Sequence, residues 1–105
     1  MKHKTTTLTL TINRKWFDLI KAGIKKEEYR EIKPYWIKRF IEDVFDAKMV
    51  HFRRFDSLVF TLGYPKADDT KCRLEFKNPK IRIGTGKPEW GAEPGKNYFV
   101  ITWEE

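Results

Sequence analysis

Hydrophobic and polar residues alternate cleanly at the start of the chain, from Thr5 to Ile12. The aliphatic side chains of Leu8, Leu10 and Ile12 fall on one face of an extended chain, and threonines fall on the other. A period of two with β-branched residues is typical of a strand that is buried on one side. We therefore expect a half-buried strand here.

A short helix is predicted to follow this strand. Asn13 is a suitable N-cap, Trp16, Phe17 and Ile20 recur at helical spacing, and Gly23 is a typical stop. A second helix is predicted to begin at Pro34, because proline suits the first helical turn. Its apolar positions continue to residue 45, at Trp36, Ile37, Phe40, Ile41, Val44 and Phe45.

The rest of the chain has the pattern of short strands. The expected strands are Met49–Phe52, Ser57–Tyr64, Lys71–Lys77, Lys80–Ile83 and Tyr98–Trp103. Residues 84–97 carry four glycines and two prolines, which favours an irregular loop, either a mobile rim over a binding site or a plain connector. The pattern predicts a single α+β domain over residues 1–105, a small and mostly antiparallel β-barrel with two helices packed at its side or mouth.

Charge is distributed unevenly along the 105 residues. The net charge is +7, and residues 1–54 hold 14 basic and 7 acidic side chains, whereas residues 55–105 hold 8 of each. A basic half beside a neutral half is typical of a protein that meets a polyanion such as nucleic acid. A basic coat that serves only solubility is the alternative.

Composition excludes several classes of protein. No stretch has the roughly 18 apolar residues of a membrane span, and the N-terminus lacks the apolar block of a signal peptide. The single cysteine, Cys72, excludes an intrachain disulfide and a cysteine-cluster metal site. His3 and His51 have no partner at metal-ligand spacing. We expect a cytoplasmic, monomeric protein with no metal, no cofactor and no membrane partner.

The segment after Gly23 is nearly all charged and is the most informative part of the sequence. If it is extended, Lys26, Glu28 and Arg30 share one face, and neither face is mainly apolar. Core burial therefore does not explain this strand, which we expect at an exposed edge or in a polar cleft.

Residues 23–30 also fit the pattern G-x-K-x-x-E-x-R, with Gly23, Lys25, Glu28 and Arg30 at the fixed positions. Placed after a strand and a short helix rich in Trp and Phe, this pattern resembles the ASCH domain, a branch of the PUA-like β-barrel superfamily. The resemblance covers Leu8 to Arg30, and the closing strand at Tyr98–Ile101 is also similar. It implies a cleft between barrel and helices that binds RNA, a nucleotide or a modified nucleoside.

Some small members of this family resemble amidohydrolases that deacetylate N4-acetylcytidine with a lysine, a threonine and a glutamate. The lysine aligns with Lys25, and the threonine aligns with Glu28, which lacks the hydroxyl. The distant glutamate has three candidate counterparts: Glu75, Glu89 and Glu93. If the chain is an enzyme, Lys25 is the expected base or nucleophile and Glu28 its acidic partner.

Several further residues are candidates for contact with nucleic acid. Tyr35 offers an aromatic face for a base, and Arg53 and Arg54 form a basic pair between two phenylalanines. The complete set of candidate binding residues is Lys25, Lys26, Glu28, Arg30, Lys33, Tyr35, Arg53, Arg54 and Trp90. The alternatives are a structural Lys–Glu–Arg ion network, a solvated turn at Arg53, and a protein-interaction domain that docks a partner on the aromatic helix.

Overall fold

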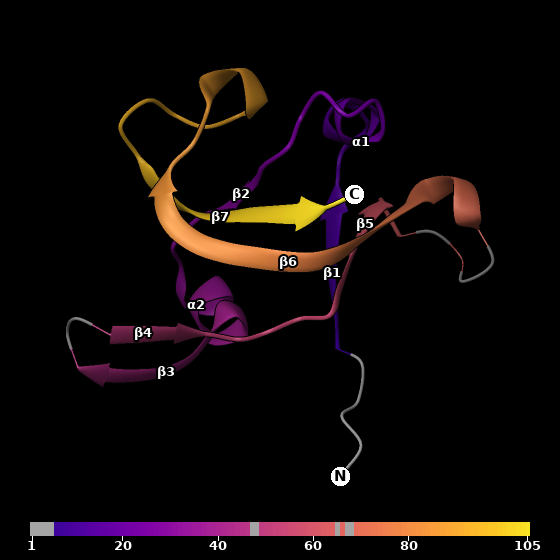
Figure 1. The fold of residues 1–105 in the computed structure, drawn as a ribbon. Coiled ribbons are helices and arrows are strands. Elements are labelled where there is room, and N and C mark those ends of the chain that lie inside the picture. The colour runs from indigo at the N-terminus through magenta and orange to yellow at the C-terminus, as the bar shows by residue number, and fades with distance from the viewer. Residues whose placement is uncertain (1–5, 47–48, 65, 67–68) are drawn as a thin grey trace, which may run out of the picture. The chain divides into compact units, whose positions relative to one another are not determined.

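The computed structural model describes residues 6–46, 49–64, 66 and 69–105 (Figure 1). In chain order the elements are β1 (Thr7–Ile12), α1 (Arg14–Lys21), β2 (Glu28–Arg30), α2 (Pro34–Phe40), β3 (Ile41–Asp46), β4 (Met49–Phe52), β5 (Ser57–Leu62), the 3₁₀ turn η1 (Thr70–Cys72), β6 (Arg73–Thr85), the 3₁₀ turn η2 (Pro88–Trp90) and β7 (Asn97–Glu104). This is an α+β fold, as the sequence predicts.

Five strands are hydrogen-bonded in the order β1-β5-β6-β7-β2, and β3 and β4 form a separate antiparallel pair. β1 runs parallel to β5, whereas β5–β6 and β2–β7 are antiparallel. The sheet is therefore mixed, and the described strands show no closed barrel.

The chain divides into two compact units. Unit 1 comprises the described residues within Met1–Lys26, Phe55–Pro79 and Trp103–Glu105, and unit 2 comprises those within Glu27–Arg54 and Lys80–Thr102. The prediction of a single domain over residues 1–105 stays a prediction.

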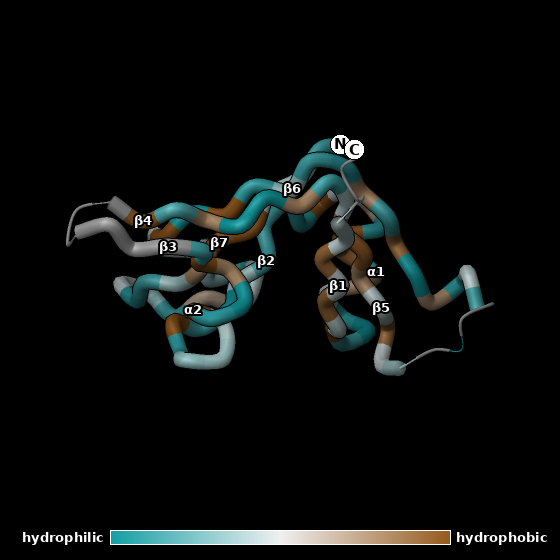
Figure 2. The backbone as a smooth tube through the Cα atoms, turned by 90° about the horizontal axis from the view of Figure 1, so that it is seen from below, coloured by the Kyte–Doolittle hydropathy of each residue, from teal (hydrophilic) through white to brown (hydrophobic). Residues whose placement is uncertain are grey.

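Unit 1 is built around the parallel pair β1–β5. The inward side chains of β1 alternate with exposed threonines, so hydropathy alternates along its trace (Figure 2). The core of unit 1 consists of aliphatic and aromatic side chains, at Leu8, Leu10, Ile12, Phe17, Ile20, Leu58 and Phe60. Asn13 caps α1, because its side-chain oxygen accepts the N–H of Trp16 at 3.1 Å. The predicted strand and helix are confirmed for the described residues; Thr5 lies outside them.

Unit 2 contains β2, α2, the β3–β4 hairpin and most of β7. Its central residue is Phe99 of β7, whose ring meets Phe40 and Phe52 edge-on at centroid distances of 5.2 and 6.3 Å. These contacts place α2 and β4 against β7. Two inner positions of β7, Val100 and Ile101, are fully buried.

The second predicted helix is about half as long as expected. α2 ends at Phe40, and Ile41 already has extended backbone and begins β3. Residues 41–46 pair with β4, with Val44 opposite Val50. The β-branched residues in this segment suit a strand, and hairpin pairing overrides the helical spacing. The side chains of Val44 and Phe45 lie outside the description.

The two strands predicted at 71–77 and 80–83 are one strand, β6, which continues through Asn78-Pro79. Asn78 adopts a positive φ of 50°, a conformation that asparagine tolerates better than most residues. Its N–H bonds to the carbonyl of Asp56 at 3.1 Å, and its side chain donates to Glu104 at 2.9 Å. The expected break is therefore a bend held by hydrogen bonds.

Candidate functional site

The predicted site residues are divided between the two units. Lys25 and Lys26 belong to unit 1, and the other seven belong to unit 2: Glu28, Arg30, Lys33, Tyr35, Arg53, Arg54 and Trp90. The hypothesis that all of them form one site stays a prediction.

Lys25 is held at the end of α1 and is buried to 1% exposure. Gly23 turns the chain with φ +75°, and the N–H groups of Ile24 and Lys25 then both bond to the carbonyl of Leu19, at 3.0 and 3.1 Å. The Lys25 ammonium lies 5.0 Å from the ring centre of Trp16, a cation–π distance. The neighbouring Lys26 is exposed. A lysine this deeply buried is a functional candidate, although structural ion pairs produce the same burial.

Glu28 and Arg30 form a buried ion pair on β2 in unit 2. The guanidinium of Arg30 lies 3.1 Å from Glu28 Oε2, and the two side chains keep only 16% and 6% of their exposure. β2 is the last strand in the sheet order but it is buried. Of the two predicted alternatives, the exposed edge is therefore wrong, because the opposite charges of Glu28 and Arg30 neutralise each other and Tyr29 packs against Tyr98 at 5.7 Å. The polar cleft stays a prediction.

Arg30 also connects β2 to the aromatic start of α2. Its guanidinium carbon lies 5.3 Å from the ring centre of Trp36, and that of Arg39 lies 5.8 Å from the same ring. Tyr35 meets Trp36 edge-on at 4.7 Å and keeps 63% of its surface exposed. Arg39 donates to the Tyr35 hydroxyl at 3.2 Å. An exposed aromatic ring thus lies among guanidinium groups.

Arg53 lies beside the end of α2. Its N–H bonds to the carbonyl of Phe40 at 2.8 Å, and its side chain donates to the carbonyl of Lys38 at 3.4 Å. Lys33, Arg53 and Arg54 are all exposed. We call the following residues the α2 surface: Arg30, Lys33, Tyr35, Trp36, Arg39, Arg53 and Arg54.

Trp90 belongs to a different cluster of unit 2. It packs against a group of buried residues that comprises Tyr29, Ala92, Tyr98 and Val100. Lys87 covers the Trp90 ring at 4.6 Å. Because Tyr29 and Arg30 are neighbours on a strand, their side chains point to opposite faces. The structure therefore groups Trp90 with Tyr29, and Tyr35 with Arg30.

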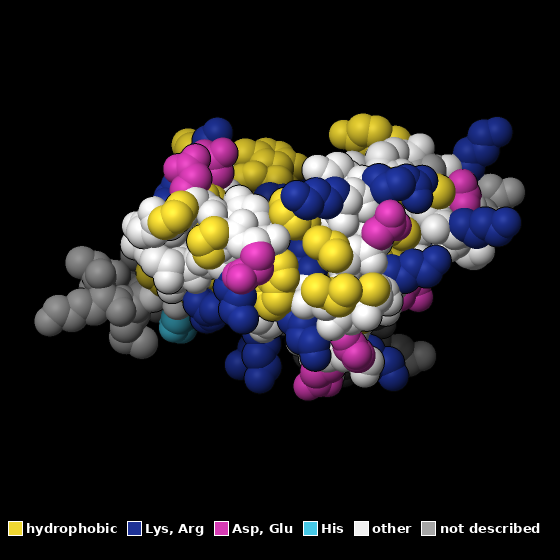
Figure 3. Space-filling model, turned by 90° about the horizontal axis from the view of Figure 1, so that it is seen from above, with side chains coloured by type: hydrophobic (Ala, Val, Ile, Leu, Met, Phe, Trp, Pro, Cys, Tyr) yellow, Lys and Arg dark blue, Asp and Glu magenta, His cyan; other side chains and the backbone are white. Residues whose placement is uncertain are grey.

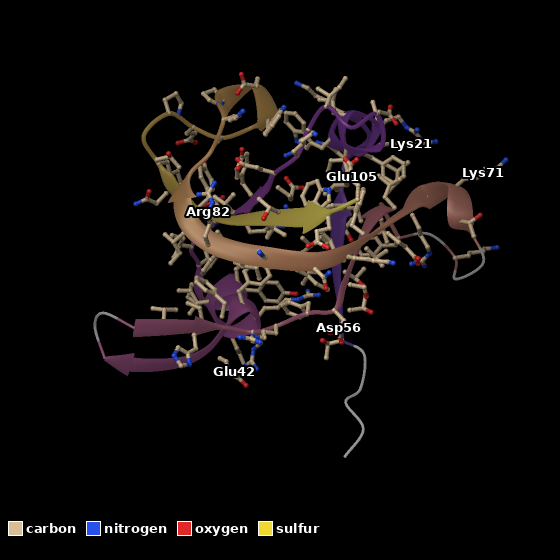
Figure 4. The ribbon with its side chains drawn as sticks, viewed as in Figure 1. Lys21, Glu42, Asp56, Lys71, Arg82 and Glu105 are labelled. Carbon is tan, nitrogen blue, oxygen red and sulfur yellow. The ribbon has the colours of Figure 1, made fainter. Side chains whose placement is uncertain are left out.

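Tyr29 makes the hydrogen bonds that hold this second cluster together, and the sequence analysis did not single it out. Its hydroxyl donates to Glu27 Oε1 at 2.7 Å and accepts the backbone N–H of Lys87 at 2.9 Å. Arg82 of β6, labelled in Figure 4, pairs with the same Glu27 carboxylate at 3.0 Å. Burial raises the pKa of Tyr29, and the bond to Glu27 raises the pKa further. The only sequence feature that could have pointed to Tyr29 is that it is the one aromatic residue in the charged segment 25–31.

Residues 86–96 are folded onto this cluster. They contain the turn η2, and the N–H of Glu93 bonds to the hydroxyl of Tyr98 at 3.0 Å. Lys96 lies 5.3 Å over the Tyr98 ring and pairs with Glu31 at 3.5 Å. The predicted loop is therefore fastened to unit 2 by tyrosine hydroxyl groups.

Charges are mixed on the molecular surface seen in Figure 3. Lysine and arginine side chains are spread over this face, and acidic and apolar side chains lie between them. On this face the net positive charge is not a continuous stripe. Recognition here needs shape and stacking in addition to charge.

The part of the chain that the structure describes holds no group of three or more His, Cys, Asp or Glu residues that could bind a metal ion. Neither of its helices has the length and apolar character that crossing a membrane requires.

The chain was compared with protein-family models, with curated proteins and with solved structures. None of the three comparisons gave a match. The geometry of the α2 surface and the sequence pattern at Gly23–Arg30 are therefore the basis for a functional assignment.

Proposed function

We propose that this chain is an ASCH-type module that binds single-stranded RNA or a nucleotide through the α2 surface. The observation that carries the proposal is the Tyr35 ring, 63% exposed and edge-on to a tryptophan between two guanidinium groups. Nucleobases stack on such rings, and each stacked base contributes about 1–3 kcal/mol. The proposal includes the PUA-like barrel that the sequence resemblance implies.

Charge around the ring supports the same ligand. Lys33, Arg53 and Arg54 are exposed cations within unit 2, and in this proposal they contact the phosphates next to the stacked base. A single strand fits better than a duplex, because its bases are free to leave their own stack. The single cysteine, Cys72, is consistent with a reducing compartment, for which the cytoplasm is our proposal.

The test is binding of a fluorescent single-stranded RNA at several salt concentrations. We expect the logarithm of the affinity to fall linearly with the logarithm of the salt concentration. If Arg53 or Arg54 contacts a phosphate, its replacement by Gln should make this line less steep by about 0.7. Tyr35→Ala should weaken binding by about five- to 150-fold.

Tyr64→Ala is the matched control, since Tyr64 is 96% exposed and belongs to unit 1. It should leave the affinity unchanged. An affinity that is absent or indifferent to salt, or an equal loss in both tyrosine variants, would reject the proposal.

A second candidate function rests on the burial of Lys25. In this alternative the chain is a hydrolase that splits N4-acetylcytidine with water into cytidine and acetate, and Lys25 acts as base or nucleophile. Desolvation lowers the pKa of a lysine in general and prepares it for either role.

Acetate release from N4-acetylcytidine tests this alternative. Lys25→Ala should abolish turnover, whereas Lys26→Ala, a change of the exposed neighbour, should preserve it. Circular dichroism would verify that both variants are folded. Unchanged turnover in Lys25→Ala would remove this residue from the mechanism.

A further inference from the structure

The exposed ring of Tyr35 has an arginine fixed at its hydroxyl end. Tyr35 and Arg39 are four residues apart on α2, so their side chains lie on the same side of the helix. Nη1 of Arg39 donates to the Tyr35 hydroxyl at 3.2 Å, and Cζ of Arg39 lies 5.8 Å from the ring centre of Trp36. These two contacts hold the guanidinium beside the ring, which keeps 63% of its surface exposed.

The charged groups at the start of α2 are hydrogen-bond donors. The guanidinium of Arg39 carries N–H groups in a planar fork and no acceptor. No acidic residue lies in the first turn of α2. Glu28, on the preceding strand, is paired with Arg30 at 3.1 Å. Glu31 is paired with Lys33 at 3.3 Å. A base stacked on the Tyr35 ring therefore meets donors at the hydroxyl end of the ring, which favours a base edge that accepts hydrogen bonds.

Guanine is the base whose edge matches this arrangement. It carries two neighbouring acceptors, O6 and N7, on its Hoogsteen edge. Adenine combines the N7 acceptor with an amino donor, cytosine presents an amino donor, and uracil presents the single acceptor O4. An arginine fork therefore makes its bidentate contact with guanine, and a good contact of this kind discriminates between bases by about five- to 150-fold.

We propose that the base stacked on Tyr35 is a guanine and that Arg39 selects it by donating hydrogen bonds to O6 and N7. This selection rests on the proposed function, because it concerns the base that the α2 surface binds. Arg39 is then the specificity-determining residue of the surface. Lys33, Arg53 and Arg54 contact phosphates, which are the same in every sequence.

The test uses fluorescent RNA pentamers of sequence UUXUU, in which only the central base X changes. The bases compared are guanine, hypoxanthine, 7-deazaguanine, adenine and uracil. Hypoxanthine keeps O6 and N7 but lacks the 2-amino group of guanine, and 7-deazaguanine has a carbon atom in place of N7. Adenine is a purine without O6, so it separates the contribution of the hydrogen bonds from that of purine stacking.

The wild-type protein should bind the guanine and hypoxanthine pentamers about equally, and at least about fivefold more tightly than the adenine or uracil pentamer. 7-Deazaguanine should lose most of this advantage, because one of the two acceptors is missing. Equal, salt-dependent affinity for all five pentamers would overturn the guanine assignment and leave the proposed function standing. Binding of none of them would overturn both. A 7-deazaguanine pentamer that binds as tightly as the guanine pentamer would exclude the contact to N7.

Arg39→Lys identifies the group responsible. Lysine keeps the charge but lacks the planar fork, so the affinity for the guanine pentamer should fall at least about fivefold, to that for the adenine pentamer. Tyr35→Phe, which removes the hydroxyl that Arg39 bonds, should reduce the preference and keep the stacking ring. Arg14→Lys, the same change at an exposed arginine of unit 1, is the control and should leave the preference intact. Circular dichroism verifies that the variants are folded. A guanine preference that survives Arg39→Lys would overturn the role of Arg39.

Discussion

The side chains of Arg30 and Glu28 bond to the backbone at the outer edge of β2, the strand that contains both residues. Glu28 Oε1 accepts the N–H of Tyr29 at 3.1 Å, and Arg30 donates to the carbonyl of Tyr29 at 2.9 Å. The second Glu28 oxygen lies 3.1 Å from the same guanidinium. Both backbone groups of Tyr29 are thus satisfied by side chains of its own strand. In an end strand this arrangement replaces the neighbour that is missing.

Breaking this ion pair should destabilise the protein strongly. Arg30→Met removes the guanidinium that lies beside the buried Glu28 carboxylate, and we expect a loss of about 3 kcal/mol in the free energy of unfolding. This is the lower end of the range for buried pairs, because Arg30 keeps 16% exposure. Urea unfolding measures the change.

The exposed pair Arg14–Asp18 is the matched control for this experiment. Its atoms are 3.8 Å apart, with side-chain exposures of 70% and 57%. Arg14→Met should change stability by no more than about 0.5 kcal/mol. If Arg30→Met costs as little as Arg14→Met, the edge-closing role of the Glu28–Arg30 pair is wrong.

The Tyr29 hydroxyl should hold residues 86–96 in place. Tyr29→Phe removes the acceptor of the Lys87 N–H and should cost about 1–3 kcal/mol of stability. Hydrogen exchange of the Lys87 amide should become faster. Tyr98→Phe should instead accelerate exchange at Glu93, whose N–H bonds to that hydroxyl. Unchanged exchange rates at both amides would show that the hydroxyl groups do not fasten this segment.

The same residue predicts a pH dependence at alkaline pH. The pKa of Tyr29 is raised in the folded protein, whereas in the unfolded chain it is ordinary, about 10. Its contribution to stability is therefore complete below pH 10 and is lost above it, because the unfolded chain then releases the proton first. We expect the stability difference between wild type and Tyr29→Phe to shrink from pH 8 to pH 11. A difference that grows over this range would contradict the burial of a neutral Tyr29.

Gly86 should be intolerant of a side chain because of its distance from the Tyr29 ring. A Cβ atom there would lie 2.5 Å from Tyr29 Cε1 and 2.8 Å from Ala92 Cβ. Gly86→Ala therefore needs a shift of buried atoms and should cost about 1–3 kcal/mol in thermal or urea unfolding. In Gly84→Ala the new Cβ atom meets only the flexible end of Arg82. This control should be nearly neutral; equal losses would indicate a backbone effect instead.

Local patterns predicted the elements whose signal lies within their own residues. The alternation of apolar and polar residues identified β1, and the Asn13 cap and Gly23 marked the two ends of α1. Both signals lie within the segment that they predict. The helix predicted over 34–45 failed where pairing with β4 takes over after Phe40. The prediction that the strand ends at Asn78 was wrong, because the backbone N–H and the side chain of Asn78 bond to Asp56 and Glu104, which are both distant in sequence. These bonds let the strand continue through the bend. Long-range hydrogen bonds of this kind leave no mark in a local pattern.

The site was predicted unevenly for the same reason. The spacing of Glu28 and Arg30 correctly put both on one face, and their ion pair follows from it. Tyr29 gave no comparable signal, since its partners Lys87 and Tyr98 lie more than fifty residues away in the chain. The sequence left β2 between an exposed edge, a polar cleft and a structural Lys–Glu–Arg ion network, because spacing alone does not show whether neighbouring charges pair with each other or face solvent.

Glu31 should compete with the proposed ligand for Lys33. The pKa of Glu31 is lowered, first by the hydrogen bond from Lys33 and then by the charges of Lys33 and Lys96. Lys33→Met should therefore raise the pKa of Glu31, and Lys96→Met should raise it less; a pH titration followed by NMR measures both. Because this pKa is depressed, the pairing is complete above the ordinary pKa of a glutamate and is lost as the pH falls through the depressed value. Protonation then releases Lys33, which lies 3.3 Å from the carboxylate. If Lys33→Met leaves the titration of Glu31 unchanged, the two side chains are not paired in solution.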